Sequence, residues 1–351
     1  MKKTVKKRKP PTAVMKSKQY DLFAEFFGKD QAELSNTIEL WDAIPKYAVT
    51  ARRQVSLRDE KGRLTVHEYA FSYNKTQSRI EMQPASIKGE GGFRDYFPSA
   101  DEELVEEVLR KIFADQRYGV HNAQAAESWV KFSLSMIRKE LKARGKTRSI
   151  AEIKHSIEVL ANTTVRLYVG DDEAPIYTAP ILSDLTRVNR AKYLDDPSAL
   201  WVARLPALVS KSVNELSYRQ FNYGTYMALP TQLSRWLHKL LSHRYVQAGY
   251  TSPYTTLYTT LKQNSGLLEA ARINTNITAL EKAFDKLQAQ SVLHGWTKEE
   301  RRGAKNRIDD VVYVLTPDGD FIRDVKAANA RQREGQEKVR GQAALPGSRR
   351  R

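Results

Sequence analysis

Basic side chains are concentrated in one short stretch near the end of the chain, between two segments with the composition of strands. Five lysines and arginines fall within ten positions: Lys298, Arg301, Arg302, Lys305 and Arg307. A basic hairpin tip of this kind is suited to holding the phosphates of a nucleic-acid backbone or to entering a minor groove. Glu299 and Glu300, in the same stretch, offer the alternative that some of these charges are paired locally.

The segment before this tip is predicted to be an amphipathic helix over residues 274–290. Its apolar residues recur at helical spacing from Ile277 to Leu287 and must face a core. The opposite face then presents amides, a hydroxyl and ammonium groups, at Asn274, Asn276, Thr278, Lys282 and Lys286. Amides near a helix N-terminus can read adenine edges in a major groove, and the backbone N–H groups there favour phosphate. The alternative is that these are ordinary helix caps and surface lysines.

The same helix and strand occur earlier in the chain. Residues 149–168 and 276–295 can be laid over each other at a constant offset so that their apolar positions coincide, beginning with Ile150 on Ile277. Further helices are predicted before each copy and a hairpin after it, which gives the order helix–helix–helix–hairpin twice. This is the order of a winged helix, and tandem units of this size are a common way of binding double-stranded DNA.

The predicted fold class is therefore α+β, with two tandem winged-helix domains, an N-terminal β-containing extension and disordered basic termini. The predicted units are a disordered tail (1–19), an extension with a helix and a β-hairpin packed on the first winged helix (20–95), the first winged-helix domain (96–198), the second winged-helix domain (199–322) and a second disordered tail (323–351). Strands are expected at 48–58 and 63–73 around a turn at 59–62, and a further turn of helix is expected within 121–130. Another strand is expected at 199–205, where the second domain begins, and Ser149 with Glu152 predicts a capped start for a helix at 149–162.

The two predicted hairpins differ in charge. The turn of the first carries Asp171, Asp172 and Glu173, which phosphate would repel. The second unit is therefore predicted to be the main DNA binder. The first unit has two open alternatives: it chiefly mediates self-association, or it contacts DNA through the basic residues of its inter-helix turn, namely Lys142, Arg144, Lys146 and Arg148.

The composition limits the classes of protein to consider. The chain has 58 Lys and Arg against 41 Asp and Glu, a net charge of +17. Most of this excess lies in the two predicted tails, so it fits either a polyanionic partner or solvated tails. The absence of cysteine excludes disulfides and thiol chemistry and suits a cytoplasmic protein. No apolar run is long enough to span a membrane, and the basic N-terminus lacks the apolar segment of a secretory signal.

No motif for catalysis is complete. Gly145-Lys146-Thr147 looks like the end of a phosphate-binding loop, but Glu140 stands where that loop needs a glycine. His238 and His243 are five residues apart, which does not place two metal ligands on one helical face. We therefore predict no catalytic residue, metal or cofactor, and a protein that is not an enzyme. The tyrosine-rich connector 217–227 is predicted to be interface core rather than a base-stacking surface.

Several segments together carry a family resemblance. They are FPSADEELVEEVLRKIF, SWVKFSLSMIRKELKARGKTRS with the capped helix after it, ALWVARLPALVS, FNYGTYMALPTQLSRWLHKLL and INTNITALEKAFDKL. With these segments the chain resembles plasmid replication initiators of the RepA type, the tandem winged-helix, iteron-binding class that includes TrfA-like proteins. The resemblance implies binding to direct repeats of a plasmid origin and opening of an adjacent A·T-rich region. It also implies recruitment of the host initiator and replicative helicase, and a homodimer that acts in copy control.

Two other functions fit the same sequence. A transcriptional regulator could use the same pair of winged helices. A nicking enzyme or primase fused to DNA-binding modules belongs to a different class, and its catalytic groups could be distant in sequence.

Overall fold

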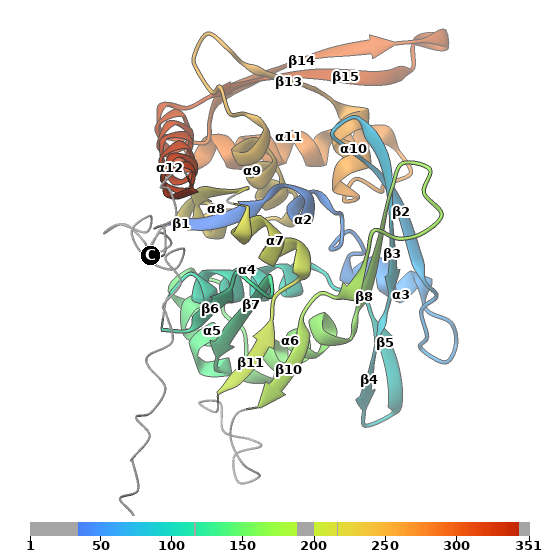
Figure 1. Ribbon diagram of the computed structural model, residues 1–351. Coiled ribbons are helices and arrows are strands. Elements are labelled where there is room, and N and C mark those ends of the chain that lie inside the picture. Colours follow the sequence, from blue (N-terminus) through green and yellow to red (C-terminus); the bar gives the residue numbers. More distant parts are fainter. Residues whose placement is uncertain (1–33, 116, 188–199, 216, 344–351) are drawn as a thin grey trace, which may run out of the picture.

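The computed structural model describes residues 34–115, 117–187, 200–215 and 217–343 (Figure 1). The predicted tail at 1–19, the start of the extension to residue 33 and the last residues, 344–351, lie outside these ranges. Helices and strands are mixed along the chain in an α+β arrangement, as predicted, and they surround two apolar cores.

The N-terminal extension contains short helices and two hairpins. Its elements are β1 (Leu34–Ile38), α2 (Glu39–Ala43), α3 (Ala51–Leu57), β2 (His67–Tyr73), β3 (Thr76–Gln83), β4 (Ala85–Gly89) and β5 (Gly92–Tyr96). The strand predicted at 48–58 is wrong, because the Thr50 hydroxyl accepts a hydrogen bond from the Arg53 backbone N–H and caps helix α3. The hairpin instead joins β2 to β3 through Asn74 and Lys75, whose φ angles of 49° and 67° suit a two-residue turn.

The first unit has the predicted helices with additional strands. Its elements are α4 (Ala100–Phe113), β6 (Gly119–Asn122), β7 (Glu127–Phe132), α5 (Leu134–Ala143), α6 (Ile150–Asn162), β8 (Thr164–Val169) and β9 (Tyr177–Pro180). The capping box at the start of α6, formed by Ser149 and Glu152, confirms the predicted helix start. The helical turn expected within 121–130 is wrong: this segment forms β6 and β7, and alternate residues of β7 are buried.

Strands of the extension and of the first unit share a sheet. Strand β3 pairs with β8, which gives the strand order β2-β3-β8-β9. The hairpin of the first unit is therefore built into a larger sheet. Strands β10 (Ser183–Arg187) and β11 (Trp201–Arg204) join β7 and β6 in a second sheet, of order β10-β11-β7-β6, and α7 (Ala207–Asn214) follows. The strand expected to open the second domain thus belongs to the first.

The second unit follows a connector, β12 (Tyr218–Asn222) and α8 (Tyr223–Ala228). Strand β12 pairs with β1, and Tyr223 and Tyr226 are fully buried, which confirms the connector as interface core. The elements of the unit are α9 (Gln232–Arg244), β13 (Tyr254–Leu257), α10 (Tyr258–Ser265), α11 (Ile273–Ala289), β14 (Leu293–Arg302), a short 3-10 helix (Ala304–Asn306) and β15 (Ile308–Pro317). Its apolar core begins at Leu229, whereas Met227 belongs to the first core, so the second unit starts later than residue 199.

A long C-terminal helix, α12 (Gly319–Ala343), replaces much of the disordered tail predicted from residue 323. Phe321, Ile322 and Val325 are buried in the second core. Further along the helix, Arg219 of β12 donates a hydrogen bond to the Asn329 side chain (2.7 Å). The prediction is wrong for residues 323–343, which are helical, because Val325 and Ala328, one turn apart on the same face of this polar segment, are buried.

Candidate nucleic-acid interface

The second unit has the topology of a winged helix. Helices α9, α10 and α11 are followed by the hairpin β14–β15, and β13 completes a sheet of order β13-β15-β14 (Figure 1). In this arrangement α11 is the helix available to a DNA major groove and β14–β15 is the wing. The predicted apolar face of α11 is confirmed, because Ile277, Leu280, Phe284 and Leu287 all lie in the core.

The outer face of α11 carries four of the five polar residues predicted for it. Asn274, Thr278, Lys282 and Lys286 are exposed along about three turns of the helix. They combine groups that can hydrogen-bond to bases with groups that attract phosphate. Their contact with DNA remains a prediction, but their placement on an open helix face is what such contact requires.

Asn276 is not on this face, and its prediction as a base-reading residue is wrong. Its side chain is only 3% exposed. The amide nitrogen donates to the Ala270 carbonyl oxygen (2.9 Å) and the Tyr258 hydroxyl (3.1 Å), and the amide oxygen accepts from the Ala270 backbone N–H (2.9 Å). All of its hydrogen-bonding atoms are thus engaged in closing the turn between α10 and α11.

Two exposed residues at the start of α11 were not predicted. Arg272 occupies the N-cap position, and Thr275 lies in the first turn. The structure places both beside Asn274, at the end of the helix that enters a groove first in proteins of this topology. A sequence signal for Arg272 was available. Gly266 ends α10 and Ile273 is the first apolar residue of α11, so Arg272 stands directly before the helix.

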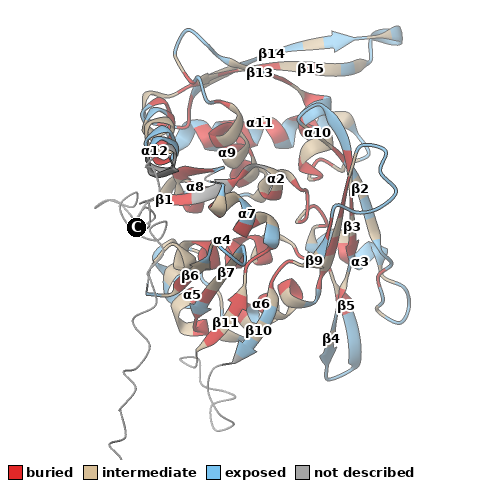
Figure 2. Ribbon diagram, in the orientation of Figure 1, coloured by how far each residue is buried: buried red, intermediate tan, exposed pale blue. Residues whose placement is uncertain are grey.

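The wing is long and basic at its tip. Strands β14 and β15 have ten residues each; the outer half of β14 is largely exposed, whereas the outer half of β15 is mostly half-buried (Figure 2). Arg301, Arg302, Lys305 and Arg307 are exposed around the turn. Lys305 has a φ of 59°, which is a left-handed conformation and lets the chain reverse without a glycine at that position.

Local pairing neutralises part of the wing, as the alternative for Glu300 anticipates. Lys298 forms an ion pair with Glu281 of α11 (2.7 Å), and Arg302 pairs with Glu300 (2.5 Å). Within the described part of the chain, no ion pair involves Arg301, Lys305 or Arg307. These three side chains are therefore the part of the wing best placed to bind phosphate.

Three of the four basic residues in the turn of the first unit are engaged by other groups of the protein, which leaves them less available to DNA; their contact with DNA stays a prediction. Arg148 donates two hydrogen bonds to Asp101 (2.5 and 3.0 Å), and Arg144 pairs with Glu140 (3.2 Å). Lys146 donates to the Leu229 carbonyl oxygen (3.0 Å), and burial together with nearby arginines lowers its pKa. Of the four predicted residues, only Lys142 is exposed.

The helix of the first unit that corresponds to α11 also lacks an open face for DNA. The extension covers α6, where His155 makes an edge contact with the Tyr96 ring (4.6 Å between centroids). Glu152 and Glu158 lie on its remaining outer side and would repel phosphate. The two units therefore differ in the surfaces that they expose, and the unequal roles predicted for them stay a prediction.

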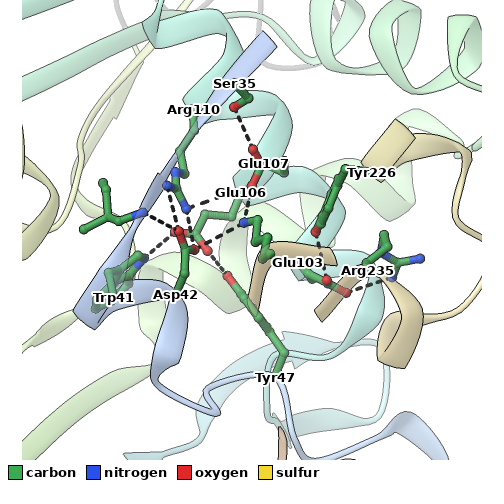
Figure 3. A network of polar contacts seen from close by, with 12 residues as sticks. Ser35, Trp41, Asp42, Tyr47, Glu103, Glu106, Glu107, Arg110, Tyr226 and Arg235 are labelled. Atoms are coloured by element: carbon green, nitrogen blue, oxygen red, sulfur yellow. Dashed lines mark hydrogen bonds and ion pairs between the residues drawn. The ribbon is translucent and has the colours of Figure 1, made fainter. Parts of the chain in front are cut away.

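A buried network of charges joins the two units (Figure 3). Asp42 of α2 accepts from Arg110 of α4 (2.7 Å) and from Lys239 of α9 (3.2 Å). Burial alone would raise the pKa of Asp42, but these two cations outweigh it and hold the pKa well below its usual value. A second contact joins Glu103 of α4 to Arg235 of α9 (2.7 Å). Because each carboxylate has a buried cationic partner, the units are held together by specific contacts.

Within the ranges that the structure describes, no group of three His, Cys, Asp or Glu residues is placed to hold a metal ion. Over the same ranges, every helix is too short or too polar to cross a bilayer.

Comparison with solved structures finds related shapes at low sequence identity. Two structures of domains 2 and 3 of RctB match, one with a TM-score of 0.45 and 13% identity over 79% of this chain and 97% of RctB's. The other has a TM-score of 0.41 and 12% identity over 77% of this chain and 98% of that one. The structure of the Pi initiator protein in complex with iteron DNA matches with a TM-score of 0.43 and 10% identity, over 62% of this chain and 91% of the Pi chain. Neither a family model nor a curated protein sequence matches the chain.

Proposed function

We propose that this protein binds double-stranded DNA through its second winged helix, with α11 in the major groove and the wing on the flanking backbone. One observation supports this most directly. An open helix face with Asn274, Thr278 and Lys282 lies next to a hairpin tip whose Arg301, Lys305 and Arg307 have no ion pair in the described chain. The first winged helix then serves mainly as a scaffold, because its corresponding helix and basic turn are engaged in packing.

We further propose that the DNA is a plasmid origin with direct repeats and that the protein is a replication initiator without a catalytic step of its own. The resemblance of the sequence to RepA-type initiators supports this assignment. Opening of the origin, recruitment of the host initiator and helicase, and dimer-based copy control follow from the same proposal. A transcriptional regulator would use the same surfaces for DNA binding.

Footprinting on the DNA that flanks the gene tests the proposal. Regularly spaced protection is expected, and a triple variant of Arg301, Lys305 and Arg307 to alanine should weaken binding to specific and random DNA alike. Its salt dependence should become shallower by about 0.9 log units per lost phosphate contact. Lys88→Ala removes one exposed lysine of β4 and is the control for the single variants Arg301→Ala, Lys305→Ala and Arg307→Ala, which each remove one charge. If Lys88→Ala weakens binding as much as these single variants do, the proposed surface is wrong.

Two experiments separate the rival functions. A plasmid that carries only this reading frame and its upstream repeats should replicate in a permissive host, and failure to replicate would favour a regulator. Supercoiled origin DNA incubated with the protein and Mg²⁺ should stay intact, and a nicked product would show that the protein is a nuclease.

A further inference from the structure

The N-terminal extension docks directly on the helix-turn-helix of the second unit. The Tyr69 hydroxyl donates to the Lys262 carbonyl oxygen at the end of α10 (3.2 Å), and the Ser72 backbone N–H donates to the Asn264 side chain (3.0 Å). Residues of β2 are therefore hydrogen-bonded to the last turn of α10. This contact lies next to the turn that leads into α11.

The turn itself is packed against the extension without a gap. Gly266 ends α10 with a φ of 63°, and a Cβ atom at this position would come within 2.5 Å of the Ala48 Cβ atom and 3.3 Å of the Tyr69 ring. Real Cβ atoms do not approach carbon this closely, so only glycine allows the contact. The extension thus fixes the position of the turn from outside, while Asn276 fixes it from inside.

One ion pair connects helix α3 of the extension to this turn. Arg53 pairs with Glu269, three residues before the N-cap residue of α11. An unpaired carboxylate so close to the N-terminus of α11 would repel a DNA phosphate bound there. The pair removes that repulsion and brings α3 to the edge of the surface that α11 offers to DNA.

The extension and the wing flank the helix-turn-helix on two sides. Helix α10 contacts β15 of the wing and also β2 of the extension. In Figure 1 the wing lies above α10 and α11, whereas α3 lies below them. Arg52 is exposed on α3, and no ion pair involves it within the described residues. Arg52 precedes Arg53 in the first turn of α3, and its side chain points roughly 100° around the helix from that of Arg53, toward solvent.

We propose that α3 forms a second basic flank of the DNA-binding surface, in which Arg53 neutralises Glu269 and Arg52 contacts a backbone phosphate. The bound duplex then has the wing on one side of α11 and the extension on the other. This inference rests on the proposed function of the second unit. It gives the N-terminal extension a role in DNA binding. The sequence patterns assign no function to this part of the chain.

Arg52→Ala tests the phosphate contact in a salt titration of the full-length protein with a duplex of the protected sequence. Binding should weaken for all sequences, and the salt slope should fall by about 0.9. Between about 50 and about 200 mM salt, the variant should lose roughly 3.5-fold less affinity than the wild type loses. Lys61→Ala removes an equal charge from the loop after α3 and should leave the slope unchanged. An unchanged slope for Arg52→Ala, or an equal effect of Lys61→Ala, would overturn the contact.

Variants of the Arg53–Glu269 ion pair test the proposal that Arg53 neutralises Glu269 beside the bound DNA. Arg53→Ala should weaken DNA binding roughly 2-fold, as expected for one charge about 8 Å from a phosphate in water. Adding Glu269→Gln to Arg53→Ala should restore binding, because the exposed carboxylate is then gone. If the double variant binds as weakly as Arg53→Ala, the pair does not act through charge and this part is wrong. If the wing variants retain full affinity as well, the proposed function fails rather than this inference alone.

Discussion

Replacing Asn276 by alanine should destabilise the second winged helix. The side chain makes three hydrogen bonds at 2.9 to 3.1 Å and is almost completely buried. Each such bond contributes about 1 kcal/mol net, and the substitution also leaves both backbone groups of Ala270 without this partner. Because Ala270 is partly accessible to water, we expect a loss of about 2–3 kcal/mol in the free energy of unfolding.

Urea denaturation followed by circular dichroism measures this loss as a lower midpoint at an unchanged slope. Asn274→Ala is the matched control, since the same side chain is removed from the exposed face of α11. It should change stability by less than about 0.5 kcal/mol but reduce discrimination between specific and random DNA by about 1–3 kcal/mol if its contact is bidentate. A stable Asn276→Ala protein that loses discrimination would show that Asn276 reaches the DNA and that our description of the turn is wrong.

Three further predictions concern the cores and the junction between the units. Burial lowers the pKa of both His238 and His243 to about 3, so the contribution of each to stability is complete above about pH 6.5 and falls by about 1.4 kcal/mol per pH unit below it. In urea titrations, His238→Phe should reduce the slope of this part of the pH profile by about 1.4 kcal/mol per pH unit and leave the contribution of His243. Val325→Ala, inside the segment predicted to be a tail, should cost about 1.5–3 kcal/mol in the same assay, whereas a disordered tail would show no loss. Arg235→Met should cost about 3–5 kcal/mol by leaving Glu103 buried without its cation, and adding Glu103→Leu should recover most of it; no recovery would argue against the pair.

Local patterns predicted the elements whose structure depends on neighbouring residues. The capping box of Ser149 and Glu152 correctly located the start of α6, and the helical spacing of apolar residues correctly located α11. The strand predicted at 48–58 failed because composition cannot show that Thr50 caps a helix. The strand β11 was recognised, but its partner β7 lies about 70 residues earlier in the chain, and local sequence does not specify such pairing.

The candidate site was predicted well in its charge and less well in its geometry. A helical wheel places Asn276 next to the polar face of α11, and only the fold of the α10–α11 turn shows that its amide points inward. The basic turn of the first unit is less open than its charge suggests for a similar reason. Arg148 finds its partner Asp101 on a different helix, so its engagement is a tertiary contact. Charge in a sequence therefore indicates a surface only after the possible internal partners are known.

The two winged helices differ because the extension binds them at different places. On the first unit it adds strand β3 to β8 and covers α6, so the hairpin and the helix that could contact DNA are used for packing. On the second unit it contacts α9, the end of α10 and the turn after α10, and the outer face of α11 stays open. The buried pairs between α4 and α9 then hold both units in one orientation. A duplicated sequence pattern thus yields one unit whose helix and hairpin are packed and one whose helix face and hairpin tip stay open, because a single non-duplicated segment packs on both.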